Sequence, residues 1–279
     1  MLAEVVRLKI AALGPEGTYS AHAAFMWDRS AELLYRDDFE AVFEAVESGE
    51  AGAGVVPVEN SLEGAVSQNM DLLLRRKPKI VGEVVVPIRH CLLGRGKRTE
   101  VRVVVSHPQA LAQCRQYLRR SFPGAEIRST GSTAHAAKLA QEFPEMAAIA
   151  GANVAEKYGL EVLERDIQDN GNNATRFAII SCEPAMMTGR DKTSLAVYLD
   201  RDRPGALYAI LGEFASRDIN LTRIESRPSR RGLGDYYFFI DLEGHRDDPP
   251  VRAALDAVRS SATMVKVLGS YPAVSWEKR

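Results

Sequence analysis

The segment DNGNNATRFAII at residues 169–180 holds the side chains most suggestive of chemistry. Small amides precede a hydroxyl, a guanidinium and a phenyl ring, those of Thr175, Arg176 and Phe177, with no His, Cys or carboxylate pair beside them. Neutral donors and one cation, without an acid–base pair, suit a substrate that carries its own driving force. Such a site holds carboxylates, desolvates one of them, and gives a proton or a hydrogen bond to a leaving group.

Four other loops place Gly or Pro beside Ser, Thr, Asn or Gln directly before a predicted helix. They are GPEGTYS at 14–20, PVENSLEG at 57–64, SHPQ at 106–109 and TGSTAH at 130–135. Helix N-termini offer free backbone N–H groups, and short hydroxyls and amides there add neutral donors. In any single loop the polar side chain is best explained as a helix cap. Four such loops, together with Asn173 and Thr175, instead predict a site for an anionic small molecule at the carboxyl ends of parallel strands.

The sequence gives little support to cofactor or metal sites. GPEGTYS lacks the third glycine of a dinucleotide fingerprint and the Gly-Lys-Ser/Thr of a phosphate loop, so no cofactor is expected. The 5 histidines have no ligand spacing, so no metal is expected. We expect His107 to stabilise its loop rather than to donate a proton, and Glu59 to hold its loop as a hydrogen-bond acceptor.

Composition narrows the class of protein further. The formal net charge of -1 gives no reason to expect nucleic acid or an anionic membrane as partner. The 3 cysteines have neither metal nor redox spacing, and the N-terminal region has charged residues among its apolar ones, unlike a signal peptide. We therefore expect a cytoplasmic protein without a membrane partner.

Hydrophobic patterning predicts two kinds of domain. As far as residue 182, short β-branched runs alternate with amphipathic helical stretches, which is typical of an α/β fold with largely parallel sheets. The order of the strands suggests two lobes, the chain crossing to the second near residue 87 and returning near residue 177. After a linker, the pattern reads strand, helix, strand, strand, helix, strand, which is the ferredoxin-like βαββαβ unit.

Several motifs together resemble those of prephenate dehydratase. GPEGTYS, PVENSLEGAV, SHPQALAQC, STAHAA and NNATRF are similar to that family in order and spacing, and GAL at 205–207 and ESRP at 225–228 are similar to the ACT regulatory domain that follows. The resemblance implies a two-lobed, periplasmic-binding-protein-like catalytic domain at 1–183, a linker at 184–191 and an ACT domain at 192–279. No chorismate mutase segment precedes the first strand, so the monofunctional form is expected.

The resemblance also implies a reaction and its residues. Prephenate would lose carbon dioxide and water to give phenylpyruvate, and Thr175 would hydrogen-bond the departing hydroxyl, either as proton donor or as relay. Arg176 would clamp a carboxylate if the segment is a loop, or brace the wall if it is a strand, with Phe177 packing the substrate ring. The other expected substrate contacts are Asn60, Ser61, Gln109, Ser132 and Thr133.

For the second domain the resemblance implies a phenylalanine sensor where two such domains meet, in a homo-oligomer that is a dimer or a tetramer. The residues expected to line or shape it are Gly205, Ala206, Leu207, Asn220, Leu221, Glu225, Ser226, Arg227 and Pro228. Two alternatives remain at this point. One is arogenate dehydratase, and the other is a non-catalytic two-lobed binding protein, which would need an export signal or a DNA-binding domain.

Overall fold

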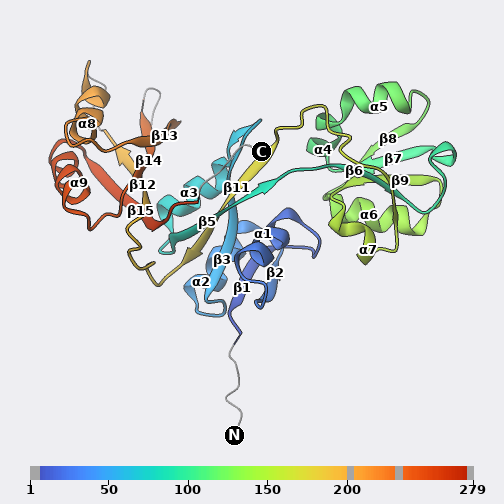
Figure 1. Ribbon diagram of the computed structural model, residues 1–279, viewed down its shortest axis with the longest axis horizontal. Helices are drawn as coiled ribbons and strands as arrows, with labels where there is room; N and C mark the ends of the chain where they lie inside the picture. The colour runs from blue at the N-terminus through green and yellow to red at the C-terminus, as the bar shows by residue number, and fades with distance from the viewer. Residues whose placement is uncertain (1–6, 200–203, 230–234, 275–279) are drawn as a thin grey trace, which may run out of the picture.

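The structure is a computed structural model that describes residues 7–199, 204–229 and 235–274. It has two α/β lobes followed by a C-terminal βαββαβ domain, and the first lobe lies between the other two bodies (Figure 1). The fold predicted from the sequence is thereby confirmed. No helix within these ranges is long and apolar enough to cross a membrane.

The first lobe is built on a mixed sheet of order β2-β1-β3-β11-β5, with β4 paired to β3. Its strands are β1 (Lys9–Leu13), β2 (Glu32–Arg36), β3 (Ala53–Asn60), β4 (Gly64–Ala65), β5 (Lys79–Pro87) and β11 (Ala174–Ser181), and its helices are α1 (Tyr19–Trp27), α2 (Phe39–Glu47) and α3 (Ser67–Arg75). β11 lies between β3 and β5 and is antiparallel to both. The expectation of a largely parallel sheet is therefore only partly met, because β11 re-enters from the second lobe in the opposite direction.

The second lobe has the strand order β10-β6-β9-β7-β8. Its strands are β6 (Cys91–Gly94), β7 (Val103–Ser106), β8 (Glu126–Ser129), β9 (Met146–Ala150) and β10 (Glu161–Glu164). Its helices are the short η1 (Arg98–Glu100), α4 (Pro108–Gln113), α5 (Arg115–Ser121), α6 (Thr133–Glu142) and α7 (Asn153–Lys157). β7 is parallel to both β8 and β9, so the carboxyl ends of these strands, where α4, α6 and α7 follow, share one edge of the sheet.

The C-terminal domain has one antiparallel sheet of order β13-β14-β12-β15. Its elements are β12 (Asp191–Tyr198), α8 (Ala206–Ala215), β13 (Leu221–Pro228), β14 (Tyr236–Glu243), α9 (Pro249–Ser261) and β15 (Met264–Pro272). Helices α8 and α9 cover one face of this sheet, and the other face packs against the first lobe (Figure 1). The approach is so close that a Cβ added to Gly269 on β15 would lie 2.0 Å from the carbonyl oxygen of Ile80 on β5.

Alternation along β11 places its side chains in two separate cores. Phe177 and Ile179 pack with α1, whereas Ala178 and Ile180 pack with α2, α3 and the apolar side chains of the C-terminal sheet. Successive side chains of a strand point to opposite faces of the sheet, so Arg176 lies on the face of Ala178. The strand that begins at the predicted site therefore contacts the C-terminal domain with every second residue.

Candidate active site

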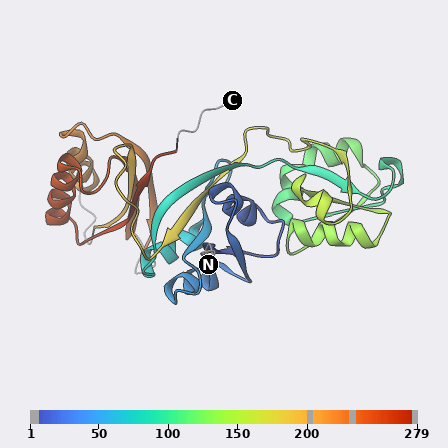
Figure 2. The same ribbon diagram turned by 60° about the horizontal axis from the view of Figure 1, so that its bottom comes forward.

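The two lobes meet where β5 and β3 end and β11 begins. Two segments, 88–90 and 165–173, cross side by side between the lobes, as Figure 2 shows from a second direction. The N–H of Ile88 donates to the carbonyl of Asn173 at 2.8 Å, and the N–H of Ile167 donates to the carbonyl of His90 at 2.9 Å. The lobes are thus joined by two chain segments that are hydrogen-bonded to each other, rather than by a single linker.

Asn60 and Thr175 face each other at this junction. Asn60, the last residue of β3, is paired in register with Thr175, near the start of β11, and both are buried. Backbone N–H groups of Leu62 and Glu63 donate to Oδ1 of Asn60 at 3.0 and 3.2 Å, which fixes the orientation of its amide. Nδ2 of Asn60 therefore donates to Oγ1 of Thr175, at 2.9 Å.

The hydroxyl of Thr175 is left with its proton available. Its oxygen accepts from Asn60, and none of the residues that the structure describes accepts its O–H. A hydroxyl can donate once and accept twice, so the Asn60 bond uses only the acceptor side. The arrangement leaves the O–H of Thr175 as a neutral donor at the junction.

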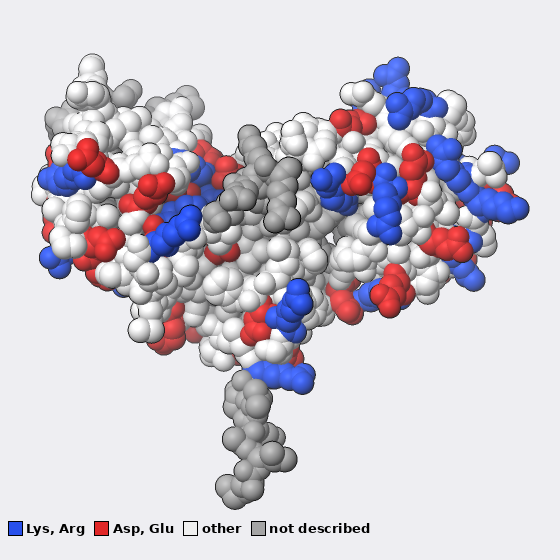
Figure 3. Space-filling model, in the orientation of Figure 1, with Lys and Arg blue, Asp and Glu red and all other residues white. Residues whose placement is uncertain are grey.

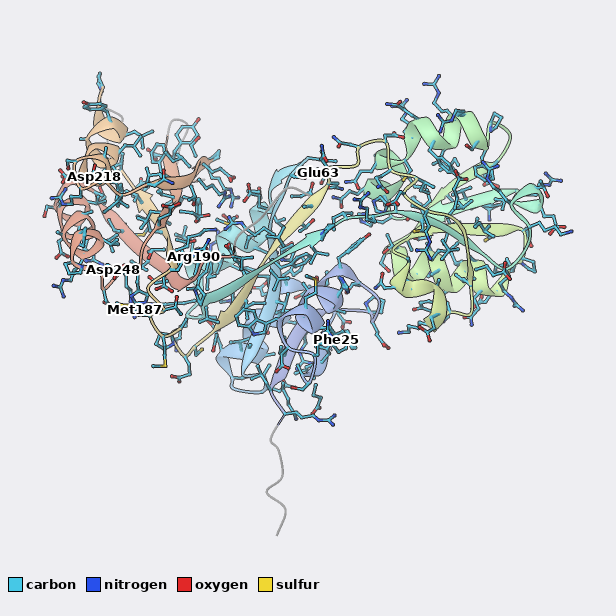
Figure 4. The ribbon with its side chains drawn as sticks, in the orientation of Figure 1. Phe25, Glu63, Met187, Arg190, Asp218 and Asp248 are labelled. Atoms are coloured by element: carbon cyan, nitrogen blue, oxygen red, sulfur yellow. The ribbon has the colours of Figure 1, made fainter. Side chains whose placement is uncertain are left out.

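A chain of amides extends from this pair into the second lobe. Oδ1 of Asn173 accepts from Asn60 at 2.9 Å, and Nδ2 of Asn173 donates to Oε1 of Gln113, in α4, at 3.0 Å. The same oxygen of Gln113 lies 2.8 Å from Nε2 of His90, and Nε2 of Gln113 donates to Oε1 of Glu63 at 3.3 Å. Gln113 thus contacts three groups at the junction, and Glu63, labelled in Figure 4, lies there at the edge of the first lobe.

The surroundings of His90 favour its neutral form. Burial lowers its pKa, and the hydrogen bond to Gln113 opposes this only in part. Because Oε1 of Gln113 can only accept, the proton of His90 is on Nε2. Its Nδ1 is buried without a hydrogen-bond partner among the described residues. A second proton on this ring would have no acceptor there.

Ser61 ties its loop to the returning chain. Its Oγ donates to the carbonyl of Asn172 at 3.1 Å and accepts from the N–H of Ala174 at 3.0 Å. Its backbone N–H also donates to the carbonyl of Ala174, at 2.9 Å. Ser61 is therefore at the junction, with its hydroxyl already engaged.

The predicted residues of the second lobe lie at helix N-termini. Oγ of Ser132 caps α6 by accepting from the N–H of His135 at 3.0 Å, and Thr133 is the first residue of that helix. Gln109 is exposed in the first turn of α4, where Nδ1 of His107 accepts from its N–H at 3.3 Å. His107 has the loop-stabilising position expected of it.

A third helix of this edge reaches the first lobe. Nζ of Lys157, at the end of α7, donates to Oε2 of Glu16 at 2.6 Å. The GPEGTYS loop, which contains Glu16, therefore contacts the C-terminal end of α7 in the second lobe. The charged groups on the face drawn in Figure 3 are of both signs and interspersed, so no single-sign surface marks a polyanion partner there.

Arg176 and Phe177 differ from the substrate contacts expected of them. The segment is already strand from Ala174, so Phe177 turns into the core beneath α1, where it is 2% exposed. Arg176 points to the opposite face, and its guanidinium lies between three carboxylates. Burial alone would lower the pKa of Arg176, but Asp241, Tyr271, Glu83 and Glu59 raise it, so the cation persists. Its position is that of the wall brace rather than the carboxylate clamp.

The residues expected to form a phenylalanine sensor lie on two faces of the C-terminal sheet. Gly205 has φ 82 at the N-terminus of α8, followed by Ala206 and Leu207. On β13, Arg227 turns toward the first lobe and donates to the carbonyl of Ser67 at 2.7 Å, whereas Ser226 and Pro228 are exposed. The remaining three are Asn220, which donates to Glu243 at 3.0 Å, half-buried Leu221, and Glu225, which is paired with Arg223.

Sequence reasoning missed several groups of this junction. His90, Gln113 and Glu63 were not singled out as site residues, although Gln113 stands inside SHPQALAQC and Glu63 inside PVENSLEG. A helix-periodic run predicts which residues face a core, but it does not indicate a contact across 60 residues such as that of Gln113 with Asn173. The positions of Gln113 and Glu63 within two of the quoted motifs were the available signal, whereas His90 lies in none of them.

Comparisons with known proteins match nearly the whole length of the chain. A family model described as prephenate dehydratase matches residues 10–185, and one described as ACT domain matches residues 193–260. The prephenate dehydratase of Methanocaldococcus jannaschii is 42% identical over 267 residues, covering 92% of this chain and 96% of the relative. Arogenate dehydratase 2 of Petunia hybrida is 41% identical over 296 residues, covering 99% of this chain and 74% of the relative.

Solved structures give the same result. The prephenate dehydratase from Arthrobacter aurescens in complex with L-Phe has a TM-score of 0.86 at 36% identity, covering 95% of this chain and 90% of that one. GqqA, described as a novel type of quorum quenching acylase, has a TM-score of 0.85 at 34% identity, covering 95% of this chain and 98% of that one. With the family model matching more than half of its length, this chain belongs to the prephenate dehydratase family and carries an ACT domain after its two lobes.

Proposed function

We propose that this protein converts prephenate to phenylpyruvate with loss of carbon dioxide and water, as a step of phenylalanine biosynthesis in the cytoplasm. The observation that carries the proposal is the direction of the hydrogen bond from Asn60 to Thr175. Because Thr175 accepts in this bond, its O–H remains as a neutral donor at the junction of the lobes. Formation of the aromatic ring drives this reaction, so the enzyme needs a donor for the leaving hydroxyl rather than a strong acid–base pair.

The proposed reaction follows from the bonds that change. The bond from the ring to its carboxylate breaks, carbon dioxide leaves, and the electron pair moves into the ring. The carbon–oxygen bond of the ring hydroxyl then breaks, and hydroxide takes up one proton to leave as water. Thr175 hydrogen-bonds this oxygen as it departs. An unperturbed alcohol is a poor acid, so we assign it a hydrogen-bonding or relay role in which Asn60 stabilises charge that develops on its oxygen.

The rest of the proposed site holds the anionic substrate. Gln109, Ser132 and Thr133 stand at the N-termini of α4 and α6, whose parent strands end at the same edge of the second lobe. Of these, α6 is the longer helix, and its free N–H groups and dipole favour a carboxylate. Ser61 shapes the opposite wall through its bonds to the returning chain.

Arogenate is the second candidate substrate. It carries an ammonium group where prephenate has a keto oxygen, and Glu63 brings an exposed carboxylate to the junction. The identity with Petunia arogenate dehydratase 2 supports the same alternative. Acyl hydrolysis has weaker support, because a nucleophilic Thr175 would need a base, and the partner of its oxygen is an amide donor.

We further propose regulation by phenylalanine at an interface between two ACT domains of a homo-oligomer. β13 is an edge strand of its sheet, and Ile224 on it is 46% exposed, which suits pairing with a second copy. The complex of the Arthrobacter aurescens protein with L-Phe supports the choice of ligand. Regulation requires that phenylalanine bind one arrangement of the domains better than another.

The test is turnover of both substrates by the purified protein, with and without phenylalanine. We expect phenylpyruvate from prephenate, a kcat/KM for prephenate above that for arogenate, and a lower rate when phenylalanine is added. A higher kcat/KM for arogenate would change the substrate and keep the site. No turnover of either compound would contradict the proposed reaction.

A further inference from the structure

A buried cluster of charges joins the catalytic strands to the ACT sheet. Arg176 on β11 lies 2.9 Å (Nη2) from Oδ2 of Asp241 on β14, 3.2 Å (Nη1) from Oε2 of Glu83 on β5, and 3.1 Å (Nε) from Oε2 of Glu59 on β3. The side chain of Arg176 is 14% exposed and that of Asp241 is 5% exposed. Because both charged groups are buried, their contact constrains how the two domains pack together.

Asp241 is itself held by the interior of the ACT domain. Its Oδ1 accepts from Oγ of Ser194 on β12 at 2.6 Å, and the same hydroxyl lies 2.7 Å from the hydroxyl of Tyr271 on β15. Ser194 and Tyr271 are both buried. One oxygen of Asp241 is thus fixed by two strands of its own domain, and the other is presented to Arg176. The position of the guanidinium therefore depends on the ACT domain.

Arg176 lies next to the proposed donor and beside an irregularity in the sheet. The register pairs Thr175 with Asn60 and Arg176 with Glu59, and it shifts directly after Arg176. A bulge of this kind changes the direction in which neighbouring side chains point. Holding Arg176 and Glu59 together on one face therefore fixes how Thr175 and Asn60 meet on the other.

The same cluster reaches the strand that carries ESRP. Arg223 of β13 lies 3.6 Å (Nε) from Oε2 of Glu59 and 4.0 Å (Nη1) from Oδ2 of Asp241, and it is also paired with Glu225. Glu225 is one of the residues expected to shape the phenylalanine sensor. A change in the pairing of Glu225 would thus alter how Arg223 competes with Arg176 for Glu59 and Asp241.

We infer that Asp241 is a positioning residue for the dehydration reaction, which holds Arg176 and through it the hydrogen-bonded geometry of Thr175 and Asn60. The ACT domain thereby supplies part of the support of the catalytic strand, and phenylalanine alters turnover through this contact. The kinetic consequences rest on the proposed function, whereas the structural consequence for β11 does not.

The test is Asp241→Asn, which keeps the shape and an acceptor for Ser194 while removing the charge opposite Arg176. We expect kcat for prephenate to fall about 10-fold with KM within about 2-fold, since the variant disturbs a contact of the transition state rather than substrate binding. The change in rate caused by phenylalanine should shrink about 5-fold. Ser194→Ala removes the hydrogen bond to Oδ1 of Asp241 but keeps the charge opposite Arg176, so it should lower kcat about 3-fold. It replaces Asp241→Asn as the test if that variant does not fold.

A double-mutant cycle separates positioning from a general loss of structure. In a Thr175→Val background, Asp241→Asn should change kcat by less than about 2-fold, because the group on which it acts is absent. The matched control is Lys266→Gln at the same domain interface, where Nζ donates to the carbonyls of Leu73, Leu74 and Arg76 at 2.8 to 2.9 Å. This control should keep the wild-type kcat even if it is less stable.

Three results would overturn the inference. The first is that Asp241→Asn keeps the wild-type kcat. The second is that Asp241→Asn lowers kcat by the same factor with and without the Thr175 hydroxyl. The third is that Lys266→Gln lowers kcat as much as Asp241→Asn does. If the wild type does not act on prephenate, the proposed function fails, but amide hydrogen exchange still tests the positioning. Asp241→Asn should then speed exchange at residues 174–177 about 10-fold, and Lys266→Gln should not; equal exchange in the two variants would refute it.

Discussion

Gln113 offers a direct test of how the junction between the lobes is held. Its Oε1 accepts from Nε2 of His90 at 2.8 Å and from Nδ2 of Asn173 at 3.0 Å, and both donors belong to buried residues. In Gln113→Ala these two donors lose their acceptor. A buried unsatisfied donor costs about 1–3 kcal/mol, and Gln113 is half-buried, so water compensates in part. We therefore expect the free energy of unfolding to fall by about 2–4 kcal/mol.

The same variant should be less active. Asn173 orients Asn60 by accepting from its Nδ2 at 2.9 Å, so a free Asn173 loosens the amide that fixes Thr175. We expect kcat for prephenate to fall about 10-fold, since a small misplacement of a reacting group is costly. Gln113→Glu keeps an acceptor for His90 and Asn173 but places a second carboxylate opposite Glu63, at a contact of 3.3 Å, so it should recover only part of the lost stability.

The assay is urea unfolding together with steady-state formation of phenylpyruvate. Gln116→Ala is the matched control, because Gln116 is exposed in the neighbouring helix and bonds through its backbone N–H, which donates to Asp169 at 2.9 Å. If Gln113→Ala and Gln116→Ala have the same unfolding free energy and the same kcat, the amide chain does not hold the junction.

Two further predictions concern pH and regulation. Burial lowers the folded-state pKa of His90 below its ordinary value of 6.5, so its contribution to stability is fully present above pH 6.5 and is lost as the pH falls below that value. Urea unfolding at pH 8 and pH 5.5 should show a smaller pH effect for His90→Asn than for wild type or for the exposed-site control His135→Asn; equal pH effects would contradict this origin. Gly205→Ala forces a side chain into a backbone with φ 82 at the proposed sensor, so calorimetry should show phenylalanine binding about 10-fold more weakly. Gly212→Ala inside α8, where an added Cβ meets nothing within 4 Å, is the control, and unchanged affinity in Gly205→Ala would remove this turn from the sensor.

The fold was largely predictable from local patterns. β-branched runs and amphipathic stretches predicted the two α/β lobes and the βαββαβ domain, because these patterns reflect which faces are buried. The expectation of mostly parallel sheets was less successful for β11. Hydrophobic runs do not encode strand direction, and the direction of β11 follows from the second lobe inserted before it.

The candidate site was predictable in part. The sequence alone allowed Arg176 either to brace the wall or to clamp a carboxylate, and the observed strand decides for the bracing position. Its partners were not predictable, since Glu83 and Asp241 lie 93 and 65 residues away in sequence and reach it only through the sheet and domain packing. The same holds for Gln113, whose role depends on a contact between the lobes.

The central claim is that the Thr175 hydroxyl, oriented by Asn60, assists the departing hydroxyl of the substrate. The measurement that tests it most directly is kcat for prephenate in Thr175→Val and Thr175→Ser, with the thermal midpoint of each. In Thr175→Val, Nδ2 of Asn60 keeps acceptors on Asn173 at 2.9 Å and Ala174 at 3.3 Å, so the fold should persist. We predict that Val lowers kcat about 100-fold or more and that Ser stays within about 10-fold of wild type. A well-folded Thr175→Val with near wild-type kcat would contradict the account.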